Sequence, residues 1–108
     1  MNINPAEVRR ELDLWYGRLV ENNAPEYVAV RMGEITEEEI RAQGIVSIIL
    51  GKLRDDQRHT GRTPNDEILG VMLVEILDST FGLDPNEIYA TMVHIRRTLP
   101  KYKKMPEA

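Results

Sequence analysis

Apolar residues recur every three or four positions along most of the chain, which is the spacing of one face of an α-helix. Two of these apolar stripes are narrow and consist of Val8, Leu12, Trp15 and Leu19, and of Ile88, Met92, Ile95 and Leu99. Narrow stripes indicate helices with one buried face, over about residues 5–22 and 85–99. We expect the second of these helices to end before Pro100, because proline cannot continue the backbone hydrogen bonds of a helix.

Two further segments, 37–57 and 64–80, are apolar over more of their circumference. In segment 64–80 the strip that remains is formed by Glu67, Val71, Glu75 and Asp78. This pattern predicts a central helix with one exposed edge. Segment 37–57 carries Gly44 and Gly51 on one face, which predicts close approach of another helix there.

Helix-start signals support these boundaries. A helix-start pattern occurs at residues 4–7, 23–26, 36–39, 63–66 and 84–87. In this pattern a capping residue is followed by proline, alanine or an acid, and an acid stands three positions after the cap. The cap accepts a free backbone N–H, and the acid complements the positive end of the helix dipole. The segment at 24–33 has both a helix start and a strand-like composition, and we favour a short helix because a single strand has no pairing partner.

The expected fold is therefore all-α. We predict a compact bundle of four main helices, at about 5–22, 37–57, 64–80 and 85–99, plus a short helix near 24–33. Residues 1–100 are expected to form a single helical domain, and residues 101–108 a flexible basic tail.

Composition narrows the function classes. The chain has 108 residues, a formal net charge of −4, two histidines and no cysteine. Lack of cysteine excludes disulfides, thiolate metal sites and a cysteine nucleophile. The N-terminal residues do not resemble a signal peptide, and the apolar runs are far shorter than the roughly 20 residues of a membrane helix. We expect a cytoplasmic protein with no cofactor, no metal site and no membrane contact.

One candidate site lies at the end of segment 37–57. The sequence from Arg54 to His59 resembles the R-[polar]-x-x-x-H pattern of the HEPN family of helical ribonucleases, and the resemblance implies that Arg54 and His59 act at a scissile phosphate. The competing interpretation is that cations at a helix C-terminus complement its negative dipole end. The basic loop here consists of Arg54, Arg58, His59 and Arg62.

A second candidate rests on carboxylates. The pairs Glu34-x-x-Glu37 and Glu75-x-x-Asp78 resemble the metal-binding motifs of MazG-like nucleotide pyrophosphohydrolases, which are small all-α enzymes that bind magnesium. If the second motif is instead aligned to start at Glu67, its second carboxylate position falls on Gly70, which supplies no ligand. The competing interpretation is that these acids are first-turn residues and the solvated edge of a buried helix.

The uneven distribution of charge along the chain and the large number of apolar residues both predict interaction surfaces. Residues 63–95 contain six acids and neither lysine nor arginine, whereas residues 96–104 contain five bases and no acid. The basic stretch predicts a surface for a protein partner or a nucleic acid, formed by Arg96, Arg97, Lys101, Tyr102, Lys103 and Lys104. The surplus of apolar residues predicts a dimer surface formed by Val46, Leu50, Val71 and Val74.

The sequence assigns no catalytic residue. We therefore expect a small, non-enzymatic interaction or regulatory protein that binds another macromolecule as a homodimer. The alternatives are a MazG-like magnesium-dependent nucleotide pyrophosphohydrolase and, less favoured, a HEPN-like ribonuclease.

Overall fold

The computed structural model describes residues 3–61 and 65–103, with side chains described as far as residue 100. Every regular element within these residues is a helix. The helices are α1 (Pro5–Glu21), α2 (Pro25–Arg31), α3 (Glu37–His59), α4 (Asp66–Ser79) and α5 (Pro85–Lys103). The predicted all-α class, with four main helices and a short one, is confirmed, and the ambiguous segment at 24–33 contains a helix.

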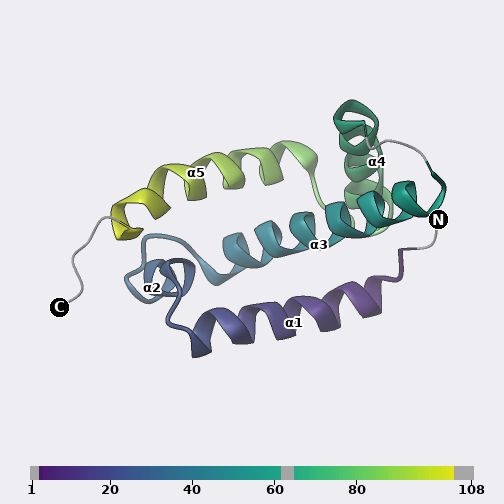
Figure 1. Cartoon of the computed structure of the whole chain (residues 1–108). Coiled ribbons are helices and arrows are strands. Elements are labelled where there is room, and N and C mark those ends of the chain that lie inside the picture. The colour runs from purple at the N-terminus through teal and green to yellow at the C-terminus, as the bar shows by residue number, and fades with distance from the viewer. Residues whose placement is uncertain (1–2, 62–64, 104–108) are drawn as a thin grey trace.

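Helix α3 occupies the middle of the molecule (Figure 1). Helices α1 and α5 lie on opposite sides of α3 and run antiparallel to it. Helix α2 crosses one end, where it contacts α1 and α5, and α4 crosses the other end, where it packs on α3 and α5. The molecule measures 48 × 26 × 26 Å, so α2 and α4 lie at the two ends of an elongated bundle.

Polar side chains define most of the helix starts. Asn4 accepts the Ala6 N–H at 3.0 Å, and Thr36 and Glu39 form a reciprocal capping box. Two of the predicted caps are wrong. Helix α4 is capped by Asn65 and begins later than expected, and α2 is capped by Ala24 without a side-chain hydrogen bond. The predicted cap of α4, at residue 63, lies outside the described residues.

The core consists of two apolar clusters along α3. The first lies at the α4 end and contains Val8, Val46, Ile49, Leu53, Leu69, Leu77 and Ile88. The second lies at the α2 end and contains Tyr16, Ala29, Ile35, Ile40, Ile95 and Leu99. Helix α3 is the central helix, because it packs against α1, α4 and α5. The prediction that segment 64–80 is central is wrong, since α4 contacts its neighbours along one side only.

The two glycines of α3 differ in their surroundings. Gly44 is buried where α1 crosses, and a Cβ atom there would lie 2.5 Å from Leu12 Cδ1 and 2.8 Å from the ring of Trp15. The predicted close approach is confirmed at Gly44. It is wrong at Gly51, which is exposed and has no neighbouring atom within 4 Å of such a Cβ.

Helix α5 extends beyond its predicted end at residue 99. Pro100 lies inside the helix, which continues to Lys103, so the first residues of the expected tail are helical. Pro100 cannot donate a hydrogen bond to the Arg96 carbonyl, and its ring crowds that carbonyl, but the buried Leu99 anchors this turn in the core. None of the helices in the described part of the chain has the length and hydropathy needed to cross a membrane.

Candidate functional site

The outer face of α4 is the most apolar exposed surface of a helix in the described residues. Ile68, Val71 and Val74 are 52%, 68% and 47% exposed, while Leu69 and Leu77 on the opposite side are buried against α3. These three exposed residues define what we call the α4 outer face. Exposed apolar residues are common singly, but three within seven positions of one helix form a contiguous patch typical of an interaction surface.

Only part of the predicted dimer surface is therefore exposed. Val46 is buried in the first core cluster, and Leu50 is partly buried against the same cluster, so neither residue contributes an exposed surface. Val71 and Val74 do lie on the α4 outer face. Ile68 completes this face and was missed, because its position in the apolar pattern predicted burial.

Acidic side chains flank the α4 outer face. Glu67, Glu75 and Asp78 are exposed on α4, and none of the three forms an ion pair within the described part of the chain. Asp66, at the start of the helix, lies 3.9 Å from the Arg54 guanidinium. Glu67 and Glu75 lie one helical turn on either side of Val71, so the α4 outer face combines apolar side chains with acidic ones.

Between α1 and α3, in contrast to the acids of α4 that form no ion pair, the cationic side chains are paired with acids. Lys52 Nζ lies 3.0 Å from Glu11 and 3.4 Å from Glu7. The hydrogen bond to Glu11 is the main reason that the pKa of Lys52 is raised. Arg41 binds Asp13 at 2.7 Å, which raises the pKa of this arginine, and its guanidinium stacks over the Tyr16 ring. These contacts join the two helices, and each of the two cations is paired with a carboxylate of α1.

The predicted basic loop does not form a closed site. Arg54, Arg58 and His59 are exposed on the last turns of α3, and Arg62 lies outside the described residues. Arg58 and His59 are in the last turn, where their charge complements the helix dipole. Arg54 and His59 are both exposed, and the Asp66 carboxylate lies 3.9 Å from Arg54, so the arrangement lacks the enclosure that a phosphate-cleaving site uses.

The carboxylates of the predicted magnesium motifs lie at opposite ends of the molecule. Glu34 and Glu37 are at the start of α3, next to α2, whereas Glu75 and Asp78 are on α4 (Figure 1). Glu37 is paired with Arg41 at 3.3 Å. Magnesium needs several oxygens at about 2.1 Å. Across the described residues, no group of three or more histidine, aspartate or glutamate side chains gathers to hold a metal ion.

The predicted basic surface lies at the C-terminal end of α5. Arg96 and Arg97 are exposed, and neither forms an ion pair with the described residues. The backbone of residues 101–103 is helical, which places Lys101, Tyr102 and Lys103 on α5, and Lys104 lies outside the described residues. Arg96 and Arg97 point in different directions around the helix, because neighbouring residues are separated by about 100°.

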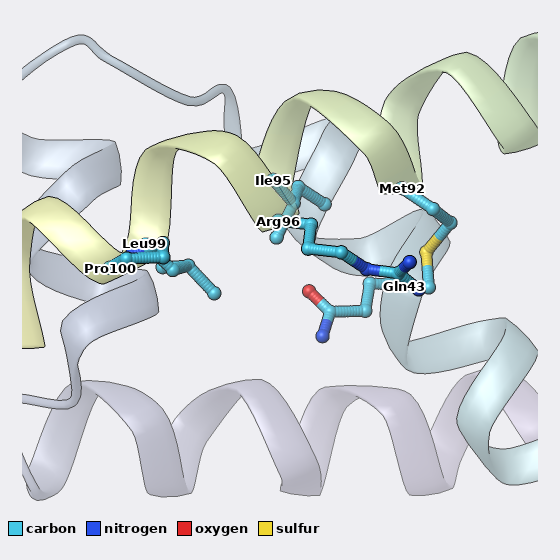
Figure 2. A pocket seen from close by; sticks show the side chains of 6 residues that line it. All are labelled: Gln43, Met92, Ile95, Arg96, Leu99 and Pro100. Carbon is cyan, nitrogen blue, oxygen red and sulfur yellow. The ribbon is translucent and has the colours of Figure 1, made fainter.

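Arg96 lines a groove between α3 and α5 that was not predicted from the sequence. The groove has a volume of about 250 Å³ and is lined by Gln43, Met92, Ile95, Arg96, Leu99 and Pro100. Figure 2 shows the Arg96 side chain extending from α5 toward Gln43 of α3 and Met92. The Gln43 Oε1 atom is buried and has no hydrogen-bond partner. The groove therefore combines apolar walls, one cation and one unpaired acceptor.

A polar contact holds α5 at the edge of this region. His94 Nε2 lies 3.0 Å from the Glu34 carbonyl oxygen and 3.9 Å from the Glu39 carboxylate. It thus links α5 to the loop before α3 and to the first turn of α3. His94 has a bridging role between elements, which its sequence position did not indicate.

Comparisons with protein-family models, with curated proteins and with solved structures find no match for this chain.

Proposed function

We propose that this protein is a non-enzymatic helical interaction protein that forms a homodimer through the α4 outer face and binds a further macromolecule through the basic end of α5. The observation that carries the proposal is the exposure of Ile68, Val71 and Val74 on one helix face. An apolar helix face of this kind gains free energy when a second apolar surface removes it from water.

A second copy of the chain supplies a surface of matching chemistry. In a dimer with two-fold symmetry, the same patch contacts itself, so each apolar residue meets apolar residues of the second copy. The interface we propose is centred on Val71, with α4 of one copy crossing α4 of the other. Glu67 and Glu75 lie one turn on either side of Val71, so this crossing brings acids of the two copies near each other, and salt screens their mutual repulsion.

The variant Val71→Glu tests this interface. It places a charge at the centre of the proposed contact, and burial of an unpaired carboxylate opposes association. Glutamate has good helix propensity, so α4 is expected to remain folded. We expect light scattering to give a monomer mass for this variant under conditions in which the unmodified protein is a dimer.

A matched control is Met32→Glu. Met32 is 66% exposed and therefore as accessible as Val71, but it lies next to α2, at the other end of the molecule. This variant is expected to keep the dimer mass. If Met32→Glu dissociated the dimer and Val71→Glu did not, the α4 outer face would be rejected as the interface.

A further inference from the structure

We draw no further inference here: the strongest candidate, the groove between α3 and α5 that is lined by Met92, Arg96 and Leu99, carries none, because nothing in the structure shows what covers it.

Discussion

At the scale of single residues, Gly44 shows how one position fixes the contact between two helices. Its missing side chain lets Leu12 and Trp15 of α1 pack directly on the backbone of α3. Gly51 lies two turns further along the same helix, yet its surroundings are open. The two glycines have the same backbone cost in a helix, so the difference between them isolates the effect of packing.

We predict opposite effects for the same substitution at these two glycines. Gly51→Ala is expected to raise the free energy of unfolding by about 0.5–1 kcal/mol through helix propensity. Gly44→Ala is expected to lower it by about 1–3 kcal/mol, because the new methyl group displaces Trp15 and Leu12. Urea denaturation followed by circular dichroism measures both values. A stabilised Gly44→Ala variant would contradict the close packing of α1 on α3.

At the scale of helices, caps decide where elements begin. The Thr36–Glu39 capping box starts α3, the helix on which both core clusters depend. Thr36 Oγ1 accepts the Glu39 N–H at 3.1 Å, and Glu39 Oε1 accepts the Thr36 N–H at 3.0 Å. This pair of bonds satisfies backbone donors that the helix itself leaves free.

Thr36→Ala is therefore expected to reduce the free energy of unfolding by about 1 kcal/mol. Thr80→Ala is the control, because Thr80 follows the end of α4, is exposed, and caps no helix N-terminus. We expect its effect to stay within about 0.5 kcal/mol. Equal destabilisation in the two variants, measured by thermal unfolding, would show that the capping box has no special role.

Sequence reasoning succeeded where the controlling physics is local. The apolar stripes and helix-start signals gave five helices with boundaries close to those observed, and Thr36 was identified as a cap. The central position of α3 was not predictable in this way. Periodicity shows which side of a helix is apolar but not which neighbour covers it, so it did not indicate that Ile68 is 52% exposed.

The candidate site was less accessible to sequence reasoning for the same reason. Arg96 stood out through local charge, and its exposure agrees with that expectation. Gln43 did not stand out, because its importance depends on the pairing of α3 with α5 and on an oxygen atom left without a partner. Val46 and Val71 were both assigned to the dimer surface, yet Val46 is buried and Val71 is 68% exposed.

At the scale of the whole molecule, charged groups between α1 and α3 make the stability depend on alkaline pH. Glu11 raises the pKa of Lys52, and burial raises the pKa of Tyr16. Each group thus holds its proton more tightly when folded than when unfolded. The stabilisation is present below the ordinary pKa of each group, and it is lost as pH rises through the folded value.

We therefore expect the free energy of unfolding to fall as the pH rises above about 10, where unfolded tyrosine and lysine lose their protons, and to go on falling until the raised folded pKa values are passed. Lys52→Met should flatten part of this decline, because it removes one of the linked groups. Urea denaturation over this pH range measures the slope. A slope that is unchanged in Lys52→Met would exclude this lysine as a source of the pH dependence.

Association between copies also has an expected salt dependence. The α4 outer face carries Glu67, Glu75 and Asp78 among its apolar residues. Two such faces repel each other weakly through these acids, and salt screens this repulsion. Homodimerisation is thus expected to strengthen as salt increases, whereas binding of a basic partner to the same face would weaken.

The most direct test of the proposed function is sedimentation equilibrium of the unmodified protein over a range of micromolar concentrations, at low and high salt. We predict twice the chain mass of 12.4 kDa, with a dissociation constant that falls as salt increases. A single monomer mass at every concentration and both salt conditions would contradict the proposal that the α4 outer face joins two copies of this chain.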